Sequence, residues 1–175
     1  MPWQCIHGGR RDTGAGLPGV TTFLADSTLR KLVKWLRIMG YDTVVHEGTA
    51  DRVLLDRGAR EDRVVLSRKK ELARRQFRGT LLIVVSDRVN EQIDEIIQRL
   101  RLVPRREDFF TRCLTCNNLL EPVQRENVKD HVPPYVFKTQ HVFVKCPYCG
   151  SIFWPGTHRE RMTAILNRHN PTDRP

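Results

Sequence analysis

The sequence predicts an α/β domain built on a parallel sheet, followed by a small cysteine-rich module. Short β-prone runs alternate with helix-like segments between residues 21 and 100, and two of these runs end at an aspartate. Alternation at these intervals is typical of parallel strands whose connecting helices cover both faces of the sheet. The module is predicted because two Cys-x-x-Cys motifs follow the last of these segments.

The first element is a β-prone run at 21–25 that ends at Asp26, and Ser27 is placed to cap the segment behind it. That segment, 28–39, carries apolar residues at helical spacing on one face and basic residues on another. Gly40 ends it, since glycine is common just after a helix terminus.

Three more strands follow, and helical segments separate them. We expect these strands at 41–45, 63–67 and 80–85. We expect the helical segments from 51 to about 59, from 68 to near 79 and from 90 to 100, with a polar loop at 46–50. The last strand is nearly all apolar, which is typical of a strand buried on both faces.

Composition divides the chain into three parts and favours an anionic partner. Residues 1–20 are rich in glycine and predict a flexible extension, 21–110 form the α/β domain, and 111–175 form the cysteine-rich module with a terminal helix. The formal net charge of the 175-residue chain is +10, which favours nucleic acid as a partner. A basic protein that is merely soluble is the plainer interpretation.

Membrane and secretory signals are missing from the sequence. No apolar run is long enough to span a membrane, and residues 1–20 lack the hydrophobic segment of a secretory signal. We therefore expect a cytoplasmic protein with reduced thiols. Cys5 has no nearby partner in the sequence and stays unassigned.

The two Cys-x-x-Cys motifs are separated by 29 residues and predict a metal site. The four cysteines are Cys113, Cys116, Cys146 and Cys149. Four thiolates at this spacing can surround one zinc ion at Zn–S distances of about 2.3 Å, and they leave no open position for catalysis. We expect a structural zinc; disulfides or unrelated buried thiols are the alternative, which the absence of a secretory signal disfavours. Asn117 and Gly150 follow the motifs and tolerate the positive φ of such turns.

The chain between the motifs predicts a β ribbon. Its apolar positions, at Val123, Val128, 132–137 and 142–145, suit short antiparallel strands rather than helices. After the second motif, 151–154 alternates in polarity and leads by a turn into the terminal helix.

Acidic residues mark the ends of two predicted strands. Asp26 and Asp87 follow the first and fourth strands, and Asp51 opens a helix that could reach the same edge. Ligands of open α/β sheets bind outside the carboxyl ends of the strands, and Mg²⁺ or Mn²⁺ takes carboxylate oxygens there. The alternative for Asp26 and Asp51 is a role in capping the helices that follow.

Two groups of residues could contact phosphates. Arg30, Lys34 and Arg37 share one face of the first helix, for which a plain solvated surface is the alternative. Ser67, Arg68, Lys69 and Lys70 follow the third strand.

Several strings of residues occur in a recognisable order. They are Phe23-Leu24-Ala25-Asp26, Trp35-Leu36-Arg37, Met39-Gly40-Tyr41-Asp42-Thr43, Arg63 to Arg68, Glu91-Gln92, both cysteine motifs, Phe153-Trp154 and Gly156-Thr157-His158. In order and spacing they resemble the Mut-7 C-terminal RNase family from about Thr21 to Met162. The resemblance implies a PIN-like parallel sheet sandwiched by helices and fused to a zinc ribbon. It also implies metal-dependent cleavage of RNA by clustered carboxylates.

The resemblance implies roles for single residues and one departure. The family's first-strand aspartate corresponds to Asp26, and its acid before the second helix corresponds to Asp51, with Glu47 the second choice. Its third acid is replaced here by Lys69, which removes a ligand and places a positive charge near the ion. Asp87 could compensate, because it also ends a strand.

Three classes of function remain open from the sequence. The first is a ribonuclease in which Asp26, Asp51 and Asp87 hold Mg²⁺ or Mn²⁺. The second is a non-catalytic RNA-binding or ribonucleoprotein-binding protein with a degenerate PIN-like site, in which Lys69 and its basic neighbours hold phosphates. The third is an adaptor that docks protein partners through the zinc ribbon.

Overall fold

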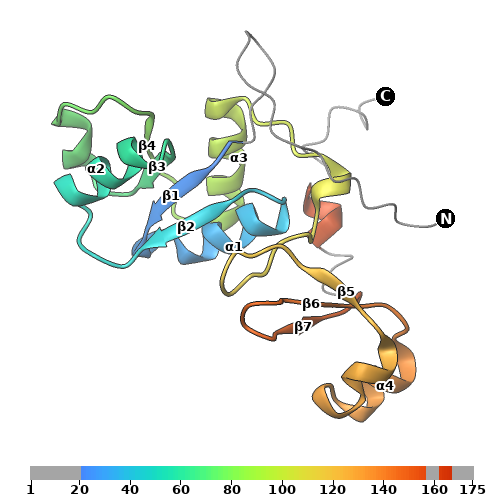
Figure 1. Cartoon of the computed structure of the whole chain (residues 1–175). Helices are drawn as coiled ribbons and strands as arrows, with labels where there is room; N and C mark the ends of the chain where they lie inside the picture. Colours follow the sequence, from blue (N-terminus) through green and yellow to red (C-terminus); the bar gives the residue numbers. More distant parts are fainter. Residues whose placement is uncertain (1–20, 157–161, 167–175) are drawn as a thin grey trace, which may run out of the picture.

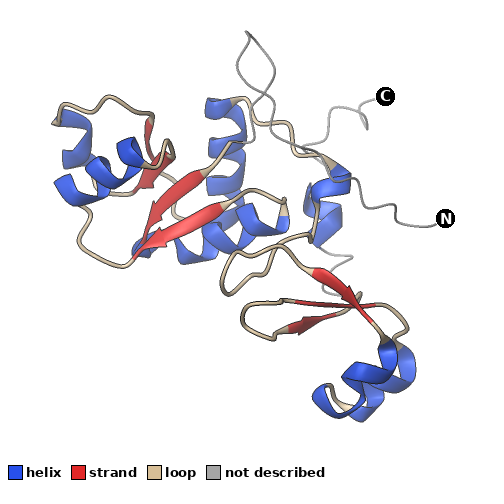
Figure 2. Cartoon of the chain, viewed as in Figure 1, coloured by secondary structure: helices blue, strands red, loops and turns tan. Residues whose placement is uncertain are grey.

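The computed structural model describes residues 21–156 and 162–166 of the chain, and the extension predicted at 1–20 lies outside them. The described residues form two sheets: a four-stranded parallel sheet with helices on both faces, and a three-stranded antiparallel sheet with short helices at its far end (Figures 1 and 2). The predicted order of an α/β domain followed by a ribbon is therefore confirmed.

The elements alternate as expected in the first part of the chain. In order they are β1 (Phe23–Asp26), the 3-10 helix η1 (Ser27–Leu29), α1 (Arg30–Ile38), β2 (Thr43–His46), α2 (Arg52–Arg60), β3 (Val64–Ser67), η2 (Lys70–Arg74), β4 (Leu81–Ile83) and α3 (Val89–Leu100). The second part contains η3 (Arg106–Asp108), β5 (Glu121–Val123), η4 (Arg125–His131), α4 (Pro134–Thr139), β6 (Phe143–Lys145) and β7 (Ile152–Phe153).

The strand order of the parallel sheet, β2-β1-β3-β4, places β1 between β2 and β3. From β1 the chain goes to β2 at one edge and then crosses over β1 to reach β3. The carboxyl end of β1 is thus the point where the order of connections reverses, which is where open α/β sheets bind ligands. Asp26 is the last residue of β1.

Side chains of the sheet alternate between two cores. Phe23 and Ala25 belong to a core that includes residues of α1 and α3, whereas Leu24 belongs to a core with residues of α2 and η2. This period of two is what a strand buried on both faces requires. It also places Asp26 on the same face as Leu24, the face that α2 covers.

The fourth strand differs from the expectation that it is buried on both faces. Pairing covers only Leu81–Ile83, and Val85 is 60 % exposed. The reason is its place in the sheet, since β4 is an edge strand that pairs with β3 alone.

The ribbon contains two helices that the sequence analysis did not predict. The expected strands around Val123 and 142–145 are confirmed as β5 and β6, but Val128 lies in η4 and 132–137 lead into and form most of α4. Val128, Val132 and Val136 are four residues apart and pack against Phe143 in a separate small core. Proline at the first turn of α4 favours this helix, because its missing N–H is not needed there.

The turn of helix at 162–166, assigned from the sequence to the zinc module, packs elsewhere. Leu166 is fully buried in the core formed by α1 and α3, together with Phe109. Figure 1 shows this turn beside the η3 segment and away from α4. Among the described residues, no helix is long and apolar enough to cross a membrane.

Candidate metal centre and strand-end site

The four cysteines of the two motifs form one cluster. One sulfur atom from each of Cys113, Cys116, Cys146 and Cys149 lies within 4.8 Å of the others. The Sγ–Sγ distances are 3.6 Å for Cys113–Cys149 and 3.3 Å for Cys116–Cys146, too long for disulfides. A tetrahedron with metal–sulfur distances of about 2.3 Å has edges of about 3.8 Å, so the cluster fits a four-coordinate metal ion.

The two motifs share one backbone geometry. The Asn117 N–H donates to the Cys113 carbonyl and the Gly150 N–H to the Cys146 carbonyl, both at 3.0 Å. Asn117 and Gly150 have φ values of 72° and 74°, as the sequence predicted. Each turn therefore directs its cysteine pair toward the same point.

The thiols of the first motif differ in acidity. Burial raises the pKa of Cys113 to about 12. Burial acts in the same direction on Cys116, but hydrogen bonds from Asn118 and from the neighbouring cysteines lower its pKa to about 6. A metal ion would replace these protons, since only the thiolate is a ligand.

Arg37 attaches the first motif to the α/β domain. Its guanidinium group donates to the Thr43 carbonyl at 2.8 and 3.0 Å, and to the carbonyls of Leu114 and Thr115 at 2.8 and 2.9 Å. The side chain is only 7 % exposed. Arg37 is therefore not on the phosphate-contacting face expected from the sequence, and this expectation is corrected.

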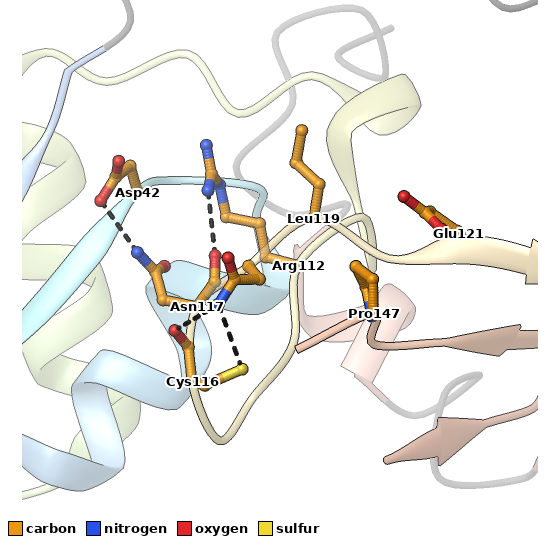
Figure 3. A pocket seen from close by; sticks show the side chains of 8 residues that line it. Asp42, Arg112, Cys116, Asn117, Leu119, Glu121 and Pro147 are labelled. Carbon is orange, nitrogen blue, oxygen red and sulfur yellow. Dashed lines mark hydrogen bonds between the residues drawn. The ribbon is translucent and has the colours of Figure 1, made fainter. Parts of the chain in front are cut away.

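Asn117 makes a second attachment beside a pocket of about 380 Å³. Its side chain accepts from the Thr43 N–H at 3.0 Å. It also donates to Asp42 at 2.9 Å, as Figure 3 shows. The Arg112 guanidinium group donates hydrogen bonds to the carbonyls of Gly40 and Asn117. Burial raises the pKa of Asp42, but hydrogen bonds from Arg63 and Asn117 outweigh it and the pKa is lowered. This carboxylate therefore stays charged within the junction.

Asp26 stands at the switch point of the sheet, and its carboxylate is fully engaged. Thr28 donates to Oδ1 through both its backbone N–H, at 2.9 Å, and its hydroxyl group. Oδ2 accepts two hydrogen bonds, one from Ser67 Oγ at 2.5 Å and one from the Arg68 N–H at 3.1 Å. The side chain is 2 % exposed. Four donors use the lone pairs that a carboxylate offers, so Asp26 joins β1 to β3 at this rim.

The other predicted acids have separate partners. Asp51 caps α2 by accepting from the Val53 N–H at 2.8 Å, the alternative that the sequence left open. Asp87 is 84 % exposed and pairs with Arg68, while Glu47 pairs with Arg30. Within the described residues, only the cysteines bring three or more ligand atoms within 4.8 Å of one another. The acidic set therefore does not fit a divalent ion as it is arranged here.

A family model for the Mut7-C RNAse domain matches residues 21–166, which include the rim, the junction and the four cysteines. The chain belongs to this family. Membership places it among ribonuclease-related proteins and confirms the resemblance inferred from the sequence. No curated protein and no solved structure matches the chain.

Sequence reasoning missed one rim residue of this Mut7-C domain. His46, expected in a loop, is the last residue of β2 and pairs in register with Asp26. It is 8 % exposed, and its imidazole makes no hydrogen bond within the described part of the chain. A histidine directly after an apolar strand, beside a strand that ends in aspartate, is the signal that could have identified it.

The predicted phosphate contacts of the Mut7-C domain divide into two groups. Lys34, Lys69 and Lys70 are exposed and form no ion pair within the described residues. Arg30 and Arg68 are exposed but paired with acids, and Ser67 is fully buried against Asp26. The free cations next to Asp26 are thus those that follow β3.

Proposed function

We propose that this Mut7-C domain binds RNA at the carboxyl-end rim of its parallel sheet. The observation that carries the proposal is the concentration of unpaired positive charge at the switch point. There Lys69 and Lys70 come just after Arg68, whose N–H donates to Asp26, in a member of a ribonuclease-related family. A phosphate at this place would meet two ammonium groups. It would also lie near the imidazole of His46, which has no hydrogen-bond partner among the described residues.

Metal-dependent cleavage of the bound RNA is the second candidate, and family membership favours it. The acids that would hold Mg²⁺ or Mn²⁺ are Asp26, Asp51 and Asp87. The arrangement in this structure supports binding more than cleavage, because Asp26 is engaged by four donors and Lys69 lies where a third ligand is expected.

Substitution of Lys69 separates the two candidates. If the domain only binds RNA, Lys69→Ala and Lys69→Asp both lower its affinity for RNA. Neither variant nor the wild type then cleaves a labelled single-stranded RNA in the presence of Mn²⁺. If the domain is a ribonuclease, the wild type cleaves the RNA and Asp26→Asn does not. Lys69→Asp, which returns a carboxylate to the rim, then cleaves the RNA faster than the wild type. Thermal unfolding of each variant shows whether a loss reflects unfolding of the domain.

We propose zinc as the ion of the cysteine cluster. Four sulfur ligands and a tetrahedral spacing suit Zn²⁺ in a structural role, and such sites contribute roughly 10 kcal/mol or more to folding. We expect one zinc per chain by elemental analysis of the purified protein. A Cys116→Ser and Cys149→Ser double variant should contain none.

A further inference from the structure

The connection between β3 and β4 carries the most concentrated positive charge near the rim. We call residues 68–79 the basic loop. It contains one acid, Glu71, and six basic residues: Arg68, Lys69, Lys70, Arg74, Arg75 and Arg78. All six are exposed, and within the described part of the chain only Arg68 forms an ion pair. The loop therefore holds a charge that nearby acids do not neutralise.

The basic loop is attached to the domain by its uncharged residues. Leu72 is 1 % exposed in the core beneath α2, and Phe77 packs against the same core. The ring of Phe77 lies over Gly58 of α2, where an added Cβ would come within 3.6 Å of it. Arg52 of α2 donates to the Gln76 carbonyl at 3.0 Å. These contacts hold the backbone while the basic side chains face solvent.

The basic loop runs from the carboxyl rim back to the amino end of the sheet. It begins after Ser67, which pairs with Ile83, and it ends before Leu81, which pairs with Val65. Three strand residues span about 10 Å. At about 3.4 Å per nucleotide of a stacked strand, this is the length of about three nucleotides. Six exposed cations on a connection of this length suit the phosphate backbone of one strand.

We propose that the basic loop binds single-stranded RNA and extends the rim site along the α2 side of the sheet. This inference rests on the proposed binding of RNA at the rim. It adds Arg74, Arg75 and Arg78 as phosphate contacts. It also gives the path of the bound strand over the surface, from Lys69 at the rim toward the amino end of the sheet.

The test compares two triple variants that remove the same charge. The first is Arg74→Ala, Arg75→Ala and Arg78→Ala in the basic loop. The control is Lys129→Ala, Lys138→Ala and Lys145→Ala, which removes three exposed lysines of the ribbon. Binding of a fluorescent single-stranded RNA is measured for both and for the wild type over a range of salt concentrations, and circular dichroism confirms folding. Arg78→Ala alone serves as a milder variant.

Each phosphate contact to a single strand contributes about 0.7 to the slope of log K against log salt concentration. Loss of three contacts should therefore reduce the magnitude of the slope by about 2 and weaken binding at 0.1 M salt by about 100-fold. The ribbon control should match the wild type. Equal losses of RNA affinity in both triple variants would overturn this inference alone. The same holds if the basic loop contributes more to the binding of duplex RNA than to the binding of single-stranded RNA. A wild type that binds no RNA would overturn the proposed function with it.

Discussion

Arg37 joins three stretches of backbone with one buried side chain. Its four hydrogen bonds reach Thr43 in β2 and Leu114 and Thr115 in the first cysteine motif. Lysine keeps the charge but has three donors on one nitrogen, whereas Arg37 makes four bonds from three nitrogens, so Arg37→Lys should leave buried acceptors unpaired. We expect a loss of about 3 kcal/mol in unfolding free energy, measured by urea denaturation. Lys34→Ala, on the exposed face of the same helix, should change it by less than about 0.5 kcal/mol.

Glu95 predicts a pH dependence of stability. Burial raises its pKa, but hydrogen bonds from the Ser86 and Val85 N–H groups and from Arg99 outweigh burial and lower it. A pKa lower in the folded than in the unfolded state adds stability above the unfolded value of about 4.3, and this stability is lost as pH falls through the folded value.

Glu95→Gln should therefore destabilise the protein by about 1–2 kcal/mol at pH 7, with the difference from wild type closing below about pH 4. Chemical denaturation across this pH range measures it. Glu91→Gln, whose nearest ion pair is 4.0 Å long, is the matched control on the same helix. A constant difference at all pH values would contradict the assignment.

The two cysteine turns are alike in backbone and unlike in their contacts. Gly150 has positive φ, and a Cβ placed there would meet nothing within 4 Å, so Gly150→Ala should cost only the backbone penalty of about 1–2 kcal/mol. Asn117→Ala loses its bonds to Asp42 and Thr43 as well, so we expect about 1–2 kcal/mol more. Thermal unfolding of the metal-loaded variants checks this order. Equal costs would show that the Asn117 bonds add no stability.

The sequence predicted elements well where one periodicity dominated. The strands of the parallel sheet and α1 were located from alternation and helical spacing, and the turn residues after each cysteine motif from their tolerance of positive φ. The prediction failed at Val128, Val132 and Val136, where β-branched residues favoured strands. In the structure Val128 lies in η4, Val136 lies in α4, and Val132 is extended between these two short helices.

The strand-end site was only partly predictable. That Asp26 ends β1 follows from the pattern, and two of its four hydrogen bonds come from Thr28 nearby, but the other two depend on Ser67 and Arg68, 41 and 42 residues away. The burial of Arg37 likewise depends on a motif 77 residues further along the chain. One sign that Arg37 is buried was local. Arg37 follows the buried Val33 by four residues, so both lie on the same side of α1.

At the scale of the whole molecule, the cysteine cluster is part of the architecture of the α/β domain. Arg37 and Asn117 both reach Thr43, the first residue of β2, and the last residue of that strand is His46 at the rim. Leu114, inside the first motif, packs against the larger core. Removal of the metal should therefore affect the start of β2 as well as the ribbon.

Chelation tests this coupling without reference to any activity. After treatment with a zinc chelator, we expect hydrogen exchange to accelerate in β5–β7 and at the Thr43 amide, whose acceptor is Asn117. The amides of β1, which pair with β2 and β3 on either side, should stay protected. The Cys116→Ser and Cys149→Ser double variant should show the same pattern without chelator. If exchange at Thr43 were unchanged while the ribbon unfolded, the two parts would be independent, and the hydrogen bonds of Arg37 and Asn117 would not transmit the loss of the metal.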